Sequence, residues 1–240
     1  MYRSMVATIK NSRQSPIDIQ TRDAIVDVNK CKPEELVFEY VEGGCDVLEV
    51  GASTCKIHAK EDATAYLTAS HLPGKFKLLQ FHFHWGEDSS VGSEHLIDGQ
   101  AYSGEVHFVF WNMNYESPDN AVNHKDGLAV LGVFIKEGEY SDAYSNITSL
   151  IRRSLESGGK SQVSPYLDLR LLIPRTNYYY AYDGSLTTPP YSENVLWTVM
   201  MDPVQMSAKQ LNCFRLICPA NYRKCQYVAG RKICCTARAH

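Results

Sequence analysis

The sequence contains no apolar run that approaches the roughly 18 residues needed to cross a bilayer, and its opening residues, MYRSMVATIK, lack the apolar stretch of a secretory signal. It also lacks a large excess of either charge, because 24 Lys and Arg residues stand against 27 Asp and Glu residues, for a net charge of −3. Neither nucleic acid nor a membrane is therefore expected as a partner. We expect a cytoplasmic monomer, with secretion as the alternative if further sequence precedes Met1.

The eight cysteines include no C-x-x-C pair, so they give no sign of a structural zinc module. Five of them lie in a Cys-rich tail, about residues 213–240. Spacing does not determine connectivity, so the tail could hold reduced thiols or disulfides, or reflect an atypical C-terminal sequence. Without a signal peptide, reduced thiols are the favoured interpretation.

Composition and patterning predict a mainly β protein with one domain over residues 1–240. Hydrophobic residues make up 44% and charged residues 21% of the chain, as in ordinary globular proteins, and no repeat or linker stands out. Two helices are expected: one from the apolar spacing of residues 147–155, before Gly158-Gly159, and one beginning at a capping box of Ser207 and Gln210. Short β-like runs cover 36–41, 64–69, 75–85, 105–111, 128–135 and 195–201.

Three histidines are spaced so that two neighbouring strands would bring them together. In residues 75–85, alternation places one set of side chains on one face: Phe76, Leu78, Gln80, His82 and His84. In residues 105–111 the corresponding set is Glu105, His107, Val109 and Trp111. A catalytic zinc needs about three protein ligands and one open position. If these strands are neighbours, His82, His84 and His107 form such a ligand set.

His-x-His alone is a weak signal, because two half-buried histidines satisfied by hydrogen bonds are the commoner case. Ligating histidines also need an acceptor for the second ring nitrogen, and Gln80 and Glu105 lie on the appropriate faces. Their coincidence favours a metal site. His95 is interpreted as a buried hydrogen-bonding residue rather than a ligand, and His240 as solvated. His58, His71 and His124 have no comparable neighbours in sequence.

Six motifs, in this order, together resemble the α-class carbonic anhydrases. They are QSPIDI (Gln14–Ile19), QFHFHWG (Gln80–Gly86), GSEH (Gly92–His95), EVHFVFWN (Glu105–Asn112), DGLAVLGVF (Asp126–Phe134) and GSLTTPP (Gly184–Pro190). The resemblance implies a central, twisted, mostly antiparallel ten-stranded sheet with a few peripheral helices. It also implies Zn²⁺ at the bottom of a conical cleft, and reversible hydration of carbon dioxide to bicarbonate and a proton by a metal-bound hydroxide.

The resemblance assigns roles to individual residues. His82, His84 and His107 would hold the zinc, while Gln80, Glu105 and the main-chain carbonyl of Asn221 would orient them. Thr187 would accept from the hydroxide and donate to Glu94, although taken alone these two could be a turn residue and a surface acid. The substrate pocket, whose apolar members could also be ordinary core, would comprise Val109, Val130, Leu186, Thr187, Thr188, Val195 and Trp197.

The chain departs from the family pattern at several points. Where fast members carry a proton-shuttle histidine this chain has Ala52 or Ser53, so we expect proton transfer to limit turnover at low buffer. His58 could substitute if its side chain faces the cleft. The aromatic N-terminal segment usual in the family is missing, and the connection between Phe214 and Asn221 is short. A catalytically weak or inactive binding or scaffold domain is the alternative function.

Overall fold

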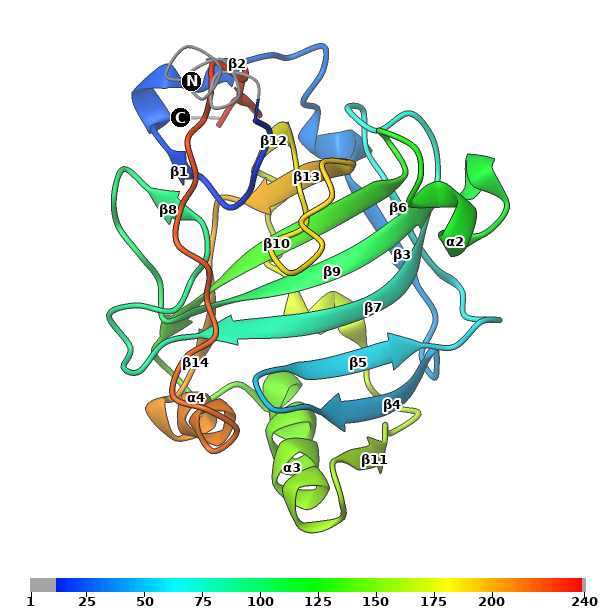
Figure 1. The fold of residues 1–240 in the computed structure, drawn as a ribbon, viewed down its shortest axis with the longest axis vertical. Coiled ribbons are helices and arrows are strands. Elements are labelled where there is room, and N and C mark those ends of the chain that lie inside the picture. The colour runs from blue at the N-terminus through cyan, green and yellow to red at the C-terminus, as the bar shows by residue number, and fades with distance from the viewer. Residues whose placement is uncertain (1–11, 239–240) are drawn as a thin grey trace, which may run out of the picture.

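A computed structural model describes residues 12–238, and a large mixed sheet forms its centre (Figure 1). Most neighbouring strands run antiparallel, as predicted, and parallel pairing joins β10 to β13 and β15 to β2. The main path of the sheet has the order β11 (Lys160–Gln162), β4 (Cys45–Val50), β5 (Cys55–Ala59), β7 (Phe76–Trp85), β9 (Gly104–Asn112), β10 (Leu128–Glu137), β13 (Val195–Met200), β12 (Tyr179–Gly184), β15 (Cys234–Cys235), β2 (Ile25–Val26).

Shorter strands extend this sheet at its margins. β3 (Val37–Tyr40) pairs with β6 (Ala65–Thr68), β6 pairs with the start of β7, and β14 (Val204–Met206) runs beside the end of β10. A separate two-stranded sheet joins β1 (Asp18–Ile19) to β8 (Leu96–Ile97). Each of the six predicted β runs forms a strand; the prediction did not include the other described strands, of which β4, β5 and β12 are the longest.

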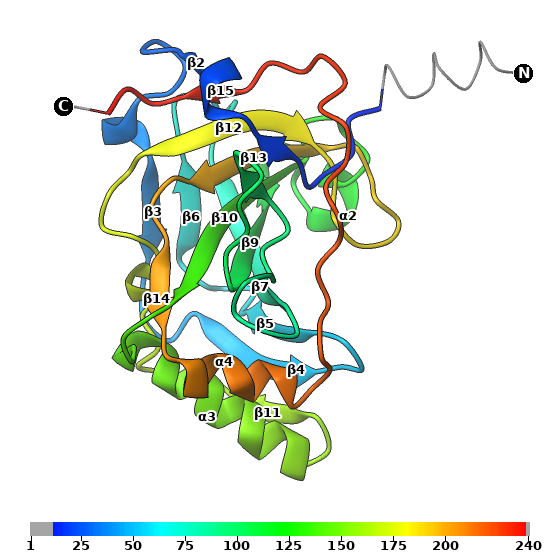
Figure 2. The same cartoon turned by 90° about the vertical axis from the view of Figure 1, so that its left-hand side faces the viewer.

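The helices lie at the periphery. α3 (Asp142–Glu156) and α4 (Ala208–Arg215) pack together at one end of the molecule, beside β4 and β7 (Figures 1 and 2). The capping box of α4 is formed: the Gln210 amide donates to Oγ of Ser207 at 3.3 Å, and Oε1 of Gln210 accepts from the Ser207 amide at 3.1 Å. The short α2 (Pro118–Ala121) and four 3-10 turns complete the described elements: Thr21–Asp23, Pro33–Glu35, Met113–Tyr115 and Leu169–Leu172.

A β-bulge in β7 corrects the predicted alternation. Leu78 pairs with Phe110 of β9 while Gln80 pairs with Val109, so Leu79 is an extra residue in the ladder. The extra residue inverts the facing of the strand. Phe76 and Leu78 therefore lie in the core cluster that holds Phe81, Phe83 and Phe108, on the opposite face from His82 and His84. The alternation predicted for β9 is confirmed.

The C-terminal segment runs from α4, at one end of the molecule, to β15, at the other end (Figure 2). After α4 the chain runs in extended form along one side of the sheet and ends in β15 (Figures 1 and 2). On its way, the Asn221 amide donates to the Trp85 carbonyl at 3.1 Å and the Gln226 amide to the Pro16 carbonyl at 2.8 Å. The short connection after Phe214 thus brings Asn221 to the end of β7.

The eight cysteines all lie within the described residues, and each is a free thiol. His240 and the segment before residue 12, on which two of the expectations fall, lie outside the described residues. No helix among the described residues is long and apolar enough to span a membrane.

Candidate metal centre

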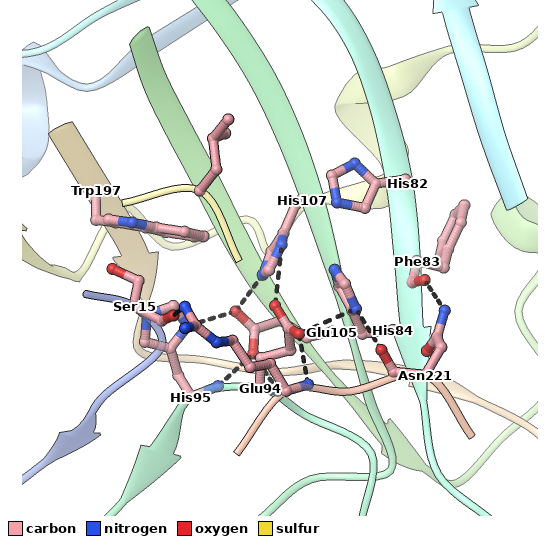
Figure 3. Close-up of polar contacts among 12 residues, drawn as sticks. Ser15, His82, Phe83, His84, Glu94, His95, Glu105, His107, Trp197 and Asn221 are labelled. Carbon is pink, nitrogen blue, oxygen red and sulfur yellow. Dashed lines mark hydrogen bonds and ion pairs between the residues drawn. The ribbon is translucent and has the colours of Figure 1, made fainter. Parts of the chain in front are cut away.

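The pairing of β7 with β9 brings the three histidines together. His82 lies directly opposite His107, and His84 opposite Glu105. The ring centroids are 5.0 Å apart for His82 and His84, 5.4 Å for His82 and His107, and 4.6 Å for His84 and His107. One nitrogen of each ring lies within 4.8 Å of the other two, and the rings point toward a common space (Figure 3).

Each ring uses its other nitrogen to contact the acceptor that the sequence suggested. Nδ1 of His82 is 2.9 Å from Oε1 of Gln80, and Nε2 of His107 is 2.7 Å from Oε1 of Glu105. Nδ1 of His84 is 3.4 Å from the Asn221 carbonyl oxygen. These contacts favour the tautomers in which Nε2 of His82, Nε2 of His84 and Nδ1 of His107 carry free lone pairs.

The electrostatic environment keeps the three rings neutral. Burial lowers the pKa of His84 to about 3, with His107 acting in the same direction. Burial also holds the pKa of His82 well below its ordinary value, and it lowers that of His107 against the opposing effect of Glu105. Because a metal binds the deprotonated imidazole, rings that are neutral at neutral pH are prepared as ligands.

An unpaired atom shows that the donor set fits a metal ion. Nε2 of His84 is fully buried and has no hydrogen-bond partner among the described residues. A buried polar atom without a partner is costly, and bonding to a cation would satisfy it. Three neutral imidazoles suit zinc, which binds histidine nitrogens at about 2.0–2.1 Å. The structure therefore presents a group, His82, His84 and His107, that could hold a metal.

Glu105 is the centre of a buried hydrogen-bond network. Its Oε1 lies 2.7 Å from both Nε2 of His107 and Nδ1 of His95, and its Oε2 accepts the main-chain amides of Glu94 and His95, each at 2.9 Å. Burial acts to raise the Glu105 pKa, but His95 and His107 outweigh it and hold that pKa well below its usual value. The carboxylate is thus ionised and fixed.

The prediction for His95 is confirmed, since its side chain is fully buried and both ring nitrogens are engaged. Nε2 lies 2.6 Å from the Tyr182 hydroxyl, which in turn lies 2.8 Å from Oγ of Ser15. His95, Glu105 and His107 also come close enough to form a second potential ligand set. Their mutual hydrogen bonds account for that proximity, so we interpret it as the support of His107.

Glu94 and Thr187 lie beside the histidines, as expected, but the hydrogen bond expected between them is not formed. Oε1 of Glu94 accepts the Arg223 amide at 2.7 Å and lies 3.3 Å from Nδ1 of His84. Oε2 has no hydrogen-bond partner among the described residues and lies 3.8 Å from Nδ1 of His107. Burial raises the pKa of Glu94 well above its usual value, while the nearby Thr187 hydroxyl and the Arg223 amide act to lower it. The Arg223 contact was not anticipated, because it links segments 129 residues apart.

A narrow pocket opens beside His82 and His107. Six of the seven predicted pocket residues line it: Val109, Val130, Leu186, Thr187, Thr188 and Trp197. The seventh, Val195, is buried in the apolar cluster next to it instead. Gly132 of β10 makes room for the site, since a Cβ there would lie 2.9 Å from Oε1 of Glu105 and 3.4 Å from the Trp197 ring.

The strand next to β7 contributes two residues to the histidine face that the sequence did not assign. In β5, Lys56 lies directly opposite His82, and His58 lies opposite Gln80. Directly opposed side chains of an antiparallel pair share a face, so His58 faces the cleft. Ala52 and Ser53, in the loop before β5, are exposed. The sequence did not assign these two residues because the register of β5 against β7 was not predicted.

A sheet that presents three convergent neutral imidazoles beside an apolar pocket has the donor set that could hold one metal ion through histidines alone. The family can be named from comparison: the sequence profile of the eukaryotic-type carbonic anhydrases matches residues 2–237, and the chain belongs to that family. Human carbonic anhydrase 7 is 35% identical over 218 residues, covering 89% of this chain and 80% of the relative. Human mitochondrial carbonic anhydrase 5A is 34% identical over 236 residues, covering 92% and 76%.

Proposed function

We propose that this protein catalyses the reversible hydration of carbon dioxide at a zinc ion held by His82, His84 and His107. Family membership supports this activity in general terms. The observation that carries the specific proposal is the set of three neutral imidazoles, each oriented by its own acceptor, with Nε2 of His84 buried and without a hydrogen-bond partner in residues 12–238.

Zinc, when bound, supplies a Lewis acid that lowers the pKa of water to about 7, a value measured for carbonic anhydrase itself rather than derived from this structure. The protein's contribution is to keep the ligands in place. Gln80, Glu105 and Asn221 fix the tautomers, and Glu105 is itself held by four N–H donors. Such fixed partners improve metal affinity and ligand orientation.

Thr187 and Glu94 orient the nucleophile in this proposal. Oε1 of Glu94 already accepts the Arg223 amide, while Oε2 is free to accept the Thr187 hydroxyl proton. A hydroxyl that donates to Glu94 keeps its lone pairs for an incoming donor, which fixes the direction of attack. The pocket of Val109, Val130, Leu186 and Trp197 suits a small uncharged substrate, and Thr188 stands at its wall.

A combined metal and activity assay tests the proposal. We expect about one zinc per purified chain, as for a three-histidine catalytic site, and carbon dioxide hydration in a stopped-flow assay. His107→Ala should lose both, whereas His124→Ala, which changes a ring stacked on Tyr115 away from the site, should retain both. Full zinc content without hydration would contradict the proposal and indicate the binding or scaffold domain instead.

A further inference from the structure

A row of charged residues crosses the sheet toward the metal centre. Lys160 of β11 lies opposite Glu49 of β4, and Glu49 lies opposite Lys56 of β5. Lys56 lies opposite His82 of β7, and His82 opposite His107 of β9. Cross-strand neighbours share a face, so this row runs along the histidine face. Ile57, between Lys56 and His58, is fully buried in the opposite core, as that register requires.

Lys56 is the member of this row whose charge is not neutralised. Oε1 of Glu49 lies 3.3 Å from Nζ of Lys160, and Oε2 lies 3.4 Å from Nε2 of His58. Both carboxylate oxygens are therefore engaged away from Lys56. Within residues 12–238, the half-buried Lys56 side chain makes no ion pair and no hydrogen bond. Its positive charge is one of the influences, after burial and the neighbouring imidazoles, that lower the His82 pKa.

Other charges around the row leave this cation effective. His82, His84 and His107 are neutral, and the Glu105 charge is matched by its four N–H donors within the buried network. Adjacent strands are about 5 Å apart, so the four-carbon stem of Lys56 can place its ammonium over the edge of the pocket. An ammonium without a carboxylate partner is suited to a small anion.

We propose that Lys56 is a determinant of the affinity with which small monovalent anions, such as bicarbonate and thiocyanate, bind at the metal centre. The inference rests on the proposed zinc site and adds a determinant of anion affinity to it. Lys56 supplies charge from one strand away, and it makes no bond to the metal. It would retain bicarbonate near the centre and increase sensitivity to competing anions.

Calorimetric titration of thiocyanate into the zinc-loaded protein at low ionic strength tests this directly. One unit charge about 7 Å away, in a medium between bulk water and a protein surface, is expected to change affinity roughly three- to tenfold. Lys56→Gln should therefore weaken thiocyanate binding by about that factor, and Lys56→Arg, which keeps the charge, should restore it. The difference between wild type and Lys56→Gln should shrink when sodium sulfate raises the ionic strength to about 0.15 M, where the Debye length is about 8 Å.

Lys209→Gln is the matched control, because Lys209 is exposed on α4 rather than on the strands of this row, and its side chain makes no ion pair or hydrogen bond within residues 12–238. It should leave thiocyanate affinity within error of the wild type. Equal affinity of Lys56→Gln and wild type, or equal losses in both Gln variants, would overturn the inference while hydration by the wild type persisted. Loss of zinc and hydration in the wild type would instead refute the proposed function.

Discussion

Glu105 supports the candidate metal centre through four contacts, because it positions His107 directly and accepts from three further N–H groups of the chain around it. A carboxylate can accept all four donors, whereas an amide turns one of its two ends into a donor. The charge and the acceptor capacity of Glu105 are therefore both used.

Glu105→Gln should weaken zinc affinity by about 10- to 100-fold, the range usual for losing the partner of a ligating histidine. The amide nitrogen would face either His107 and His95 or the two main-chain amides, and each arrangement leaves buried donors unpaired. Competition with a chelator measures the affinity. Glu137→Gln, at an exposed position near the end of β10, is the control; equal affinities in the two variants would contradict this account.

At this scale the sequence predicted much of the site, because short-range alternation places Gln80 beside His82 and Glu105 beside His107. What it could not supply from spacing was contact between distant segments. The Asn221 carbonyl reaches His84 across 137 positions, and only resemblance to a family indicated that contact. The Arg223 amide on Glu94 and the register that turns Lys56 toward His82 were not predicted.

The bulge at Leu79 divides β7 into two parts with opposite facing. Before it, Phe76 and Leu78 face the large apolar core; after it, the histidines face the cleft and Phe81 and Phe83 face that core. The bulge lets one continuous strand fill the core along its whole length while turning His82 and His84 the other way. The side chain of Leu79 is 38% exposed.

Deleting Leu79 should remove zinc binding or cooperative folding, because a one-residue change of register exchanges the two faces of the strand on one side of the deletion. Leu79→Ser keeps the extra residue and changes only a partly exposed side chain, so it should unfold within a few degrees of the wild type. Thermal unfolding followed by near-ultraviolet circular dichroism, together with zinc content, measures both. A deletion variant with normal melting and full zinc would show that the bulge does not set the facing.

Among the elements, those with strong apolar patterns or explicit caps were the ones predicted. β9 and β10 are buried along most of their length, and α4 begins at a capping box. β4 and β5 were not anticipated because they are short and place charged residues such as Glu49 and Lys56 among their apolar ones. In α3, Leu155 fits the apolar spacing but is 42% exposed, since the helix packs through its earlier turns.

At the scale of the whole molecule, the proposed hydration requires a route by which a proton leaves the cleft. Ala52 and Ser53 have no titratable side chain, and the nearest candidate on the cleft face, His58, is 3.4 Å from Glu49 and partly exposed. A cleft that lacks a dedicated carrier depends on buffer molecules for this step.

Turnover at low buffer should therefore rise and then saturate as imidazole is added, while kcat/KM for hydration stays constant because proton release follows the attack on carbon dioxide. Stopped-flow assays across imidazole concentrations at fixed pH and ionic strength measure both constants. A kcat independent of imidazole would show that the protein already carries an efficient proton route.

The sequence predicted the class of the architecture, but it did not predict how the C-terminal segment packs against the sheet. Apolar patterning indicated a large sheet, and the motifs indicated its family. The path of residues 216–233 along the side of the sheet, which places Asn221 and Arg223 against the site, follows from main-chain contacts with Trp85 and Pro16 that no local pattern encodes.

The position of the metal is the most direct test of the central claim. Crystals of the zinc-loaded protein, measured on either side of the zinc absorption edge, should show one anomalous peak about 2.0–2.1 Å from Nε2 of His82, Nε2 of His84 and Nδ1 of His107, with one position open to solvent. A peak between His95 and Glu105, a fourth protein ligand in the open position, or no peak at the three histidines would contradict the account.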